Sequence, residues 1–314
     1  MARKKPITVE ALWQIERVGT PSLSPDGAQA VCALSRYSMA ENKASTALWL
    51  LSTLGGQPRA LTQCGEKDAH PAFSPQGDRI GFIARREQQG RRDEEAQFYV
   101  IAADGGEAQR VGEVATGIEA FRWCPDGRRI VFVSWVWPGL KGAKAQAKAL
   151  RAHKARSETG YATSEAYYRY WDHFVPMGRV PHLHVMDIST GRVRDLFEGS
   201  PYELARGEPD LLCFDVSPDG RKAVFAHDPA ERKRCDGRFA LCEVDLRNGR
   251  FTPVAQDPEW DFSAPRYNAD ASSIAFIASH QARKHTMPQQ LAVWERGVGH
   301  QVVSAGWDRS VQGP

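Results

Sequence analysis

The hydrophobic positions of this chain come in short blocks, and tight polar turns separate the blocks. Four apolar runs follow such turns, at residues 80–83, 130–133, 223–226 and 274–277. They are rich in β-branched and aromatic residues, and runs of this kind between turn signals predict β-strands. The chain is therefore predicted to be mainly β.

One turn motif recurs along the chain. It first occurs as Ser24-Pro25-Asp26-Gly27, returns at residues 74–77, 124–127 and 217–220, and leaves a degenerate copy at 268–271. Proline presets φ at the first corner, the Asp or Gln side chain can bond back to the backbone, and glycine accepts positive φ. Each copy is predicted to form the tip of a hairpin.

A second landmark, a glycine at the end of a later apolar run, gives the repeat its length. It follows the last residue of the turn by 29 residues in three units, by 28 in the fifth and by 64 in the third. Two hairpins per unit make four strands, and four-stranded units at this period are typical of β-propeller blades. The pattern predicts an all-β propeller with five visible blades, at about residues 21–65, 71–115, 121–196, 213–254 and 265–303. The third blade carries a helical insertion at 135–180.

Residues 1–20 are predicted to form an N-terminal helix and a lead-in to the first blade. The helix is expected to run from Thr8, which can cap it, to Val18, just before Gly19. Its apolar side chains have no local partner, so we expect them to dock on something outside the first blade. These residues are Leu12, Trp13 and Ile15.

The insertion begins with a basic stretch. The residues that share one helical face there are Lys141, Lys144, Lys148 and Arg151. Because the stretch lacks a wide apolar stripe, residues 139–160 are expected to be exposed and mobile. Nucleic-acid binding is disfavoured, since aromatic interleaving is missing and the net charge of the chain is only +3.

An aromatic stretch follows at residues 161–174 and supplies the main candidates for a substrate or interface site. They are Arg169, Tyr170, Trp171 and His173. Aromatic rings beside a cation suit a binding surface. They suit a plug between blades equally well, and both interpretations stay open.

Two acidic residues and two histidines are weaker candidates. Glu94 and Glu95, in a charged loop, could bind the amino terminus of a peptide, although a solvated loop is the simpler interpretation. His182 and His184 alternate on a strand and so share one face of it. A metal would need a third ligand that the sequence does not place, so structural histidines are favoured, and no metal or cofactor is expected.

Composition narrows the class of protein. The 314 residues are 42% hydrophobic and 25% charged, as in ordinary globular proteins. No apolar run approaches the roughly 18 residues needed to span a membrane, and the basic N-terminus lacks an apolar signal segment. Six scattered cysteines without a CxxC pair favour reduced thiols. We therefore expect a cytoplasmic protein with neither a nucleic-acid nor a membrane partner.

The whole pattern resembles the N-terminal propeller of the prolyl oligopeptidase family of serine peptidases, in its acylaminoacyl-peptidase-like branch. The resemblance covers essentially the entire chain. It is carried by the opening helix and by residues 168–173, 181–185 and 260–267. It implies a seven- or eight-bladed propeller that caps a C-terminal α/β-hydrolase domain of the same polypeptide and admits oligopeptide substrates.

The sequence departs from that family at the catalytic machinery. No serine has a glycine two residues before it, so the G-x-S-x-G nucleophile elbow is absent. No Ser-Asp-His triad can be assigned, and we expect these residues alone to be inactive as a peptidase. Trp307-Asp308 repeats Trp260-Asp261 at the start of blade five, so a sixth unit is expected and the ring is expected to be truncated.

Two functions from different classes follow. The first is the gate and substrate-size filter of a serine peptidase, a hydrolase acting in proteolysis, whose catalytic domain is missing here. The alternative is a stand-alone five-bladed scaffold for protein–protein interaction, similar to the Tol-system propeller. A truncated ring would expose strand edges, so association into a homo-oligomer is expected in the first case. Peptide specificity and exo- versus endopeptidase action stay open.

Overall fold

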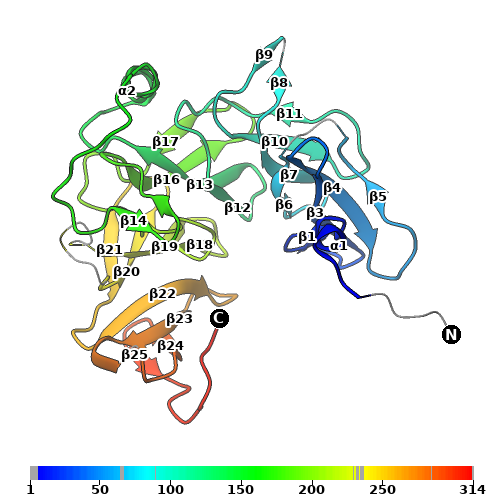
Figure 1. Ribbon diagram of the computed structural model, residues 1–314. Helices are drawn as coiled ribbons and strands as arrows, with labels where there is room; N and C mark the ends of the chain where they lie inside the picture. The colour runs from blue at the N-terminus through cyan, green and yellow to red at the C-terminus, as the bar shows by residue number, and fades with distance from the viewer. Residues whose placement is uncertain are drawn as a thin grey trace. The chain divides into compact units, whose positions relative to one another are not determined.

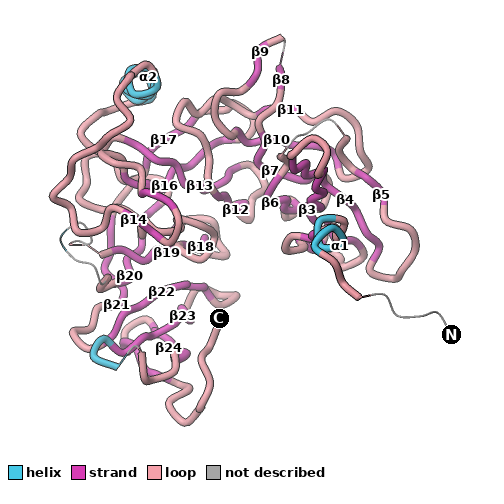
Figure 2. The backbone as a smooth tube through the Cα atoms, in the orientation of Figure 1, coloured by secondary structure: helices cyan, strands magenta, loops and turns pink. Residues whose placement is uncertain are grey.

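The computed structural model describes residues 6–63, 67–88, 90–228, 230, 233, 237–283 and 285–312. The chain divides into two compact units, Met1–Glu113 and Val114–Pro314. Nearly all regular structure in both units is β, and Figure 2 shows how few helical turns accompany the strands. None of the helices in these described ranges is long and apolar enough to cross a membrane.

Unit 1 contains two main sheets (Figure 1). The first consists of β1 (Arg17–Val18), β2 (Ser22–Leu23), β3 (Gln29–Ser38), β4 (Lys43–Ser52) and β5 (Arg59–Ala60). The second consists of β6 (Ala69–Phe73), β7 (Arg79–Ala84), β10 (Gln97–Ala102) and β11 (Gln109–Arg110). A small hairpin, β8 (Glu87–Gln88) and β9 (Arg91–Arg92), extends the connection between β7 and β10. The helix α1 (Val9–Trp13) precedes the first sheet.

Unit 2 contains three four-stranded sheets. The third blade consists of β12 (Ala120–Trp123), β13 (Arg129–Val136), β16 (Val180–Asp187) and β17 (Val193–Asp195). The fourth consists of β18 (Phe214–Val216), β19 (Lys222–His227), β20 (Ala240–Asp245) and β21 (Phe251–Ala255). The fifth consists of β22 (Trp260–Tyr267), β23 (Ser273–His280), β24 (Gln290–Glu295) and β25 (Gly299–Val302), with a 3₁₀ turn at Gln281–Arg283. The insertion in the third blade adds α2 (Ala143–Lys154), β14 (Arg169–Tyr170) and β15 (His173–Phe174).

Four of the five main sheets are antiparallel meanders, whose strands lie side by side in their order along the chain, and in the first sheet β1 and β2 both pair with β3. This is the blade topology that the glycine spacing predicts, and it confirms the predicted fold class, a β-propeller. The starts of two blades differ from the prediction. Arg17 and Val18 already pair with β3 in the first sheet, ahead of residue 21. β22 begins at Trp260, ahead of the predicted start of blade five at residue 265, because Trp260–Ser263 already pair with β23.

The recurrent turns fold as their chemistry requires. In the first turn, the Ser24 hydroxyl donates to Asp26 at 2.6 Å and accepts the Gln29 amide at 2.9 Å. Gly27 has a φ of 70° and donates its amide to the Ser24 carbonyl. The copy at residues 217–220 repeats this arrangement with Ser217 and Asp219. The serines of these turns are therefore bound to their own hairpins.

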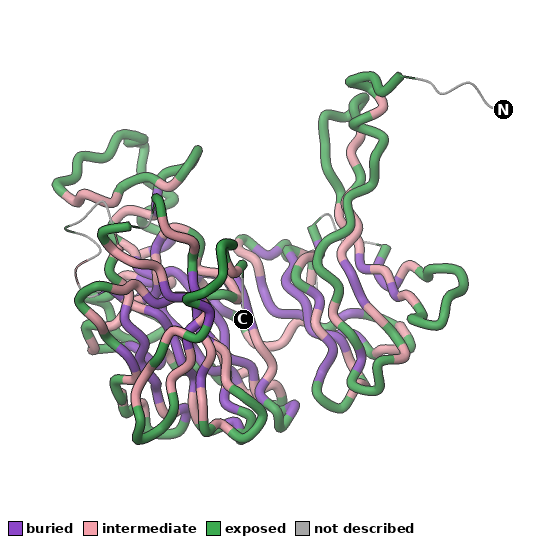
Figure 3. The backbone as a smooth tube through the Cα atoms, turned by 90° about the horizontal axis from the view of Figure 1, so that it is seen from below, coloured by how far each residue is buried: buried purple, intermediate pink, exposed green. Residues whose placement is uncertain are grey.

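The apolar runs meet between neighbouring sheets of the same unit. In unit 1, one cluster joins Val31 and Leu48 of the first sheet to Phe82 of the second. In unit 2, one cluster lies between the third and fourth sheets and another between the fourth and fifth. Figure 3 shows this burial along the strands of each unit. Since a fully buried Phe or Leu contributes roughly 1.5–3 kcal/mol, each blade depends on its neighbour for most of its core.

The opening helix is shorter than predicted. Thr8 does cap α1, accepting the Ala11 amide at 3.2 Å, but the helix ends at Trp13. Arg17 and Val18 form β1 instead, because the edge of β3 supplies backbone partners to them. The prediction of a helix to Val18 is wrong for that reason.

Candidate functional site

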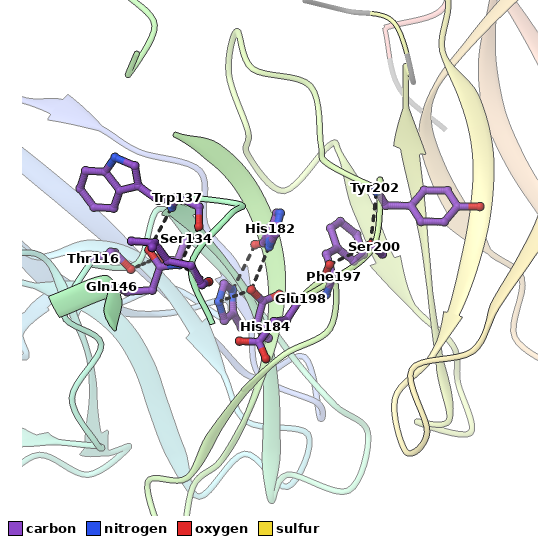
Figure 4. A network of polar contacts seen from close by, with 12 residues as sticks. Thr116, Ser134, Trp137, Gln146, His182, His184, Phe197, Glu198, Ser200 and Tyr202 are labelled. Carbon is purple, nitrogen blue, oxygen red and sulfur yellow. Dashed lines mark hydrogen bonds and ion pairs between the residues drawn. The ribbon is translucent and has the colours of Figure 1, made fainter. Parts of the chain in front are cut away.

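A network of polar contacts surrounds a histidine pair on the third blade (Figure 4). Nδ1 of His182 lies 2.8 Å from an oxygen of Asp195, and Nε2 of His184 lies 3.8 Å from the same oxygen. Both imidazoles are buried, at 2% and 6% exposure. The structure therefore places a carboxylate between the two histidines that the sequence puts on one face.

The strand register creates this cluster. β16 and β17 pair so that His184 lies opposite Asp195. The other oxygen of Asp195 accepts the Phe197 amide at 2.8 Å, and the His184 ring stacks on Phe132 with 5.0 Å between ring centres. Burial lowers the pKa of His184, so that imidazole stays neutral. Burial alone would raise the pKa of Asp195, but the hydrogen bond from His182 and the nearby imidazoles lower it overall.

This arrangement suits hydrogen bonding better than metal binding. Because an ionised Asp195 can only accept, Nδ1 of His182 carries a hydrogen and donates a hydrogen bond to the carboxylate. Within the described ranges, no group of three His, Cys, Asp or Glu residues is arranged to hold a metal ion. The predicted absence of metals and cofactors stays a prediction.

A serine lies beside the network but is not placed as a nucleophile. Ser134 is the cross-strand partner of His182, so serine, histidine and aspartate follow one another across three adjacent strands. The Ser134 hydroxyl, however, is fully buried and donates to the Gly117 carbonyl at 2.6 Å. An activated serine needs its hydroxyl directed to a base and open to substrate. The Ser134 hydroxyl meets neither condition, so we assign this cluster a structural role in the blade.

The helix α2 is anchored at two buried residues, Gln146 and Leu150, which the prediction of an exposed segment missed, whereas residues 151–160 are exposed as predicted. The predicted mobility stays a prediction. The Gln146 side chain donates to the carbonyls of Trp137 and Leu140, at 2.9 and 3.0 Å, and accepts the Trp137 amide at 2.9 Å. Leu150 is buried, and Glu198 accepts the Gly142 amide at the start of the helix. The sequence argument considered only an apolar stripe, and a single amide side chain supplies much of the anchoring. The basic face itself is exposed, at Lys144, Lys148 and Arg151.

The aromatic stretch forms a hairpin that brings its four candidate residues together. Arg169 and Tyr170 lie on β14, His173 lies on β15, and Trp171 occupies the turn with a φ of 49°. The Tyr170 ring packs edge-on against Trp171 and His173, at 6.4 and 5.8 Å. Trp171 is 79% exposed, and Phe174 is 73% exposed. The tip of the hairpin therefore presents aromatic surface to solvent.

The base of the hairpin is held by buried charge. Arg206, which is 3% exposed, pairs with Glu165 at 2.9 Å and with Glu203 at 3.3 Å. The rings of Tyr167 and Tyr170 lie so close to Gly207 that a Cβ there would fall 2.7 Å from the Tyr167 hydroxyl. The base of the stretch therefore packs on unit 2 and its tip is exposed, while the binding surface and the plug between blades both stay predictions.

The other predicted site residues lie in unit 1. Glu95 pairs with Arg85 at 3.2 Å, and Glu94 is exposed in the loop before β10. Leu12 in α1 and Ile15 just after it are 50% and 53% exposed, whereas Trp13 packs edge-on against Tyr37 at 5.8 Å. Trp13 thus has a local partner that the sequence argument missed. Peptide binding by the glutamates and docking by α1 stay predictions.

Sequence reasoning missed Asp195 and Gln146, although a signal existed for the first. Gly191 marks the end of the third unit, so the strand after it pairs with the one that carries the histidines. Counting back from that turn would have placed Asp195 opposite His184. The anchoring of Gln146 depends on the path of residues 137–142, for which the sequence holds no comparable signal.

Comparisons with known proteins find similarity to peptidases. The fold defines the class, a β-propeller, and no protein-family profile matches the chain. Over 283 residues the chain is 26% identical to dipeptidyl-peptidase 5 of Porphyromonas gingivalis, covering 87% of this chain and 39% of that protein. It is 23% identical to the uncharacterised peptidase YuxL of Bacillus subtilis over 231 residues, covering 73% and 32%. The chain thus spans well under half the length of these curated relatives.

Solved structures support the same fold. An acylaminoacyl peptidase from Pyrococcus horikoshii superposes with a TM-score of 0.65 at 14% identity, over 95% of this chain and 41% of that one. A TolB-type structure from Agrobacterium tumefaciens superposes with a TM-score of 0.52 at 15% identity, over 91% and 80%. Together, the named relatives and the structural neighbours fit a propeller of the prolyl oligopeptidase family of serine peptidases.

Proposed function

We propose that this chain is the non-catalytic propeller of a serine peptidase, acting as gate and substrate-size filter for an α/β-hydrolase domain. One observation carries the proposal. The chain matches dipeptidyl-peptidase 5 along most of its own length but along only 39% of that protein. Propellers are suited to filtering, because their sheets surround a central channel.

The chemistry of the serines supports a separate catalytic domain. Acyl transfer needs an activated nucleophile and an oxyanion hole. The sequence contains no G-x-S-x-G elbow. Ser24 and Ser217 bond within their turns, and Ser134 is committed to the Gly117 carbonyl. The proposal therefore assigns peptide-bond cleavage to residues outside these 314.

Two exposed surfaces are proposed contacts of the whole enzyme. The tip of the aromatic hairpin, with Trp171 and Phe174, is proposed to contact substrate or the hydrolase domain. Two exposed residues at the N-terminus, Leu12 in α1 and Ile15 just after it, are proposed to dock on the hydrolase domain. Both surfaces offer large apolar area, which is the usual core of an interface.

A fluorophosphonate probe tests the proposal. The probe reacts with a serine only when a base removes the proton and an oxyanion hole receives the charge. We expect no labelling of residues 1–314 and labelling of the full product of the same gene at one serine outside them. Labelling within 1–314 would overturn the proposal, as would a full gene product that stays unlabelled.

The scaffold function is the second candidate. The similarity to the TolB-type structure, which spans 80% of that chain, favours it. An unlabelled full gene product that ends soon after residue 314 would promote this alternative over the peptidase.

A further inference from the structure

Two arginines of unit 2 occupy equivalent positions in the repeat. The residue two places before each turn is Ser22, Ala72, Arg122, Asp215 and Arg266 in the five blades. In unit 2 these side chains come from the first strands of three successive sheets, β12, β18 and β22. β18 contacts both β12 and β22, so Asp215 lies on the strand between the two arginines.

Both guanidinium groups bind the same two backbone carbonyls. Nη2 of Arg122 donates to the Leu211 carbonyl at 2.7 Å, and its Nε donates to the Phe214 carbonyl at 3.1 Å. Nη2 of Arg266 donates to the Leu211 carbonyl at 3.1 Å, and its Nη1 donates to the Phe214 carbonyl at 3.3 Å. Two cations from different blades therefore converge at the start of β18.

The acidic groups nearby compensate this charge incompletely. Asp215 lies 3.6 Å from Nε of Arg122, but its other oxygen accepts the Tyr267 amide at 3.0 Å. Asp210 attracts both arginines from further away, and its carboxylate is held by the Leu212 amide. Among the described residues, Arg266 makes no ion pair within 4.0 Å.

The pKa values reflect the same imbalance. Burial lowers the pKa of Arg122. Burial and the neighbouring Arg122 lower the pKa of Arg266 to about 10. A bound anion would relieve both effects, because it would compensate the two charges at once.

The two guanidinium groups keep donors that are not fully buried. In the described part of the chain, Nη1 of Arg122 and Nε of Arg266 make no hydrogen bond, and neither is among the fully buried polar atoms. The Arg122 side chain is 27% exposed. A charged guanidinium N–H without a protein partner is a strong donor to a carboxylate oxygen, and each arginine keeps one such nitrogen.

A purely structural role would not require this arrangement. Arg129 also links the third blade to the fourth, donating to the Gly220 carbonyl at 3.0 Å, and it pairs with its own Asp126 at 2.8 Å. Its charge is balanced within the blade. Arg122 and Arg266 duplicate each other at the same carbonyls, and among the described residues only Arg122 has a carboxylate within 4.0 Å.

We propose that Arg122 and Arg266 form a receptor for the carboxylate group of a bound peptide, with β18 between them as its base. The identity of the ligand as a peptide rests on the proposed peptidase function, whereas the affinity for a carboxylate rests on the arginines alone. The carboxylate could come from the C-terminus of the peptide or from an acidic side chain. The same atoms would bind either source.

Calorimetric titration of the chain 1–314 tests the receptor with three short peptides. The first is acetyl-Ala-Ala-Ala with a free C-terminus, the second is its C-terminal amide, and the third is acetyl-Ala-Glu-Ala-amide. We expect the free acid to bind at least about tenfold more tightly than the amide, as charge-assisted hydrogen bonds require. Preference for the third peptide over the second would assign the site to acidic side chains. Equal binding of all three, or of none, would overturn the proposal.

Variants separate the receptor from blade stability. R122Q and R266Q should each abolish the preference for the carboxylate. R129Q, which also breaks a bond between blades three and four, should retain it. If R122Q fails to fold, R122K replaces it. Lysine keeps the positive charge but lacks the planar donors, so binding of the free acid should weaken. A preference that survives in R122Q and R266Q would contradict the assignment. Because the assay measures binding and not cleavage, it can succeed even where the fluorophosphonate test fails.

Discussion

At the scale of single residues, the histidines of unit 2 show how burial decides protonation. His227 at the end of β19 lies against the rings of Tyr202 and Phe225, with 4.8 and 5.8 Å between ring centres. Burial lowers its pKa to about 4, although the neighbouring Asp228 acts in the opposite direction. The folded chain therefore holds this imidazole neutral across most of the acidic range.

Stability should consequently fall in mild acid. In the unfolded chain His227 takes up a proton near pH 6.5, whereas in the folded chain it does so only near pH 4. Between these two pH values the unfolded state binds more protons than the folded state. The contribution of His227 to the free energy of unfolding is therefore lost as the pH falls. The free energy of unfolding can be measured with urea at pH 7 and at pH 5. Its decrease between these two pH values should be about 2 kcal/mol smaller in H227Q than in the parent chain. An equal loss in both proteins would contradict this role, since His184 and the carboxylates titrate in each.

The residues of the third blade also show what the sequence could predict at this scale. The alternation of His182 and His184 placed them on one face, and the structure agrees. Asp195 escaped the argument because its position depends on the pairing of β16 with β17, which is set by a turn beyond the strand. A contact between side chains on neighbouring strands can be predicted only after the register of the two strands has been assigned.

At the scale of elements, the strands could be predicted because each turn carries its own chemistry. Proline, aspartate and glycine fix the hairpin tips locally, as the Ser24 and Ser217 turns show. The helices were predicted less well because their limits are set by distant partners. α1 ends early because the residues after it form β1 and pair with the edge of β3. α2 is held by hydrogen bonds from Gln146 to the preceding loop.

The anchoring of α2 predicts a local effect of one substitution. Gln146→Ala removes the partners of the Trp137 amide and carbonyl and of the Leu140 carbonyl. A buried polar group left without a partner costs about 1–3 kcal/mol, so α2 should open more often. Hydrogen exchange of Ala143–Lys154 should become about tenfold faster or more, while exchange in the β-strands stays unchanged.

Lys148→Ala is the matched control, because Lys148 lies on the exposed face of the same helix. Its exchange should stay within about twofold of the parent chain, since alanine is a strong helix former. Exchange in α2 that is fast in the parent chain, or unchanged by Gln146→Ala, would mean that the helix does not depend on this anchor.

At the scale of the whole molecule, a constant spacing of glycines predicted five sheets because a repeat protein solves the same packing problem in each unit. The function could not be read in the same way. Within unit 2, the positions that vary between otherwise equivalent blades, such as Arg122 and Arg266, carry the information about ligands. Repetition therefore identifies the fold, and departures from repetition indicate the candidate sites.

The proposed size filter makes the last prediction. Besides Arg122, two further arginines join the third blade to the fourth, since Arg129 donates to the Gly220 carbonyl and Arg194 to the Leu246 carbonyl. In the full gene product, the double variant R129A/R194A should loosen this contact. Each lost hydrogen bond is worth about 1 kcal/mol, so the ratio of kcat/KM for a long over a short peptide should rise about fivefold or more. Hydrolysis of the short peptide should change little, because the catalytic domain is untouched.

R128A is the control, since Arg128 is exposed next to Arg129 and should leave the ratio unchanged. A ratio that stays constant in the double variant, or activities that fall together for both peptides, would mean that the propeller does not select substrates by size.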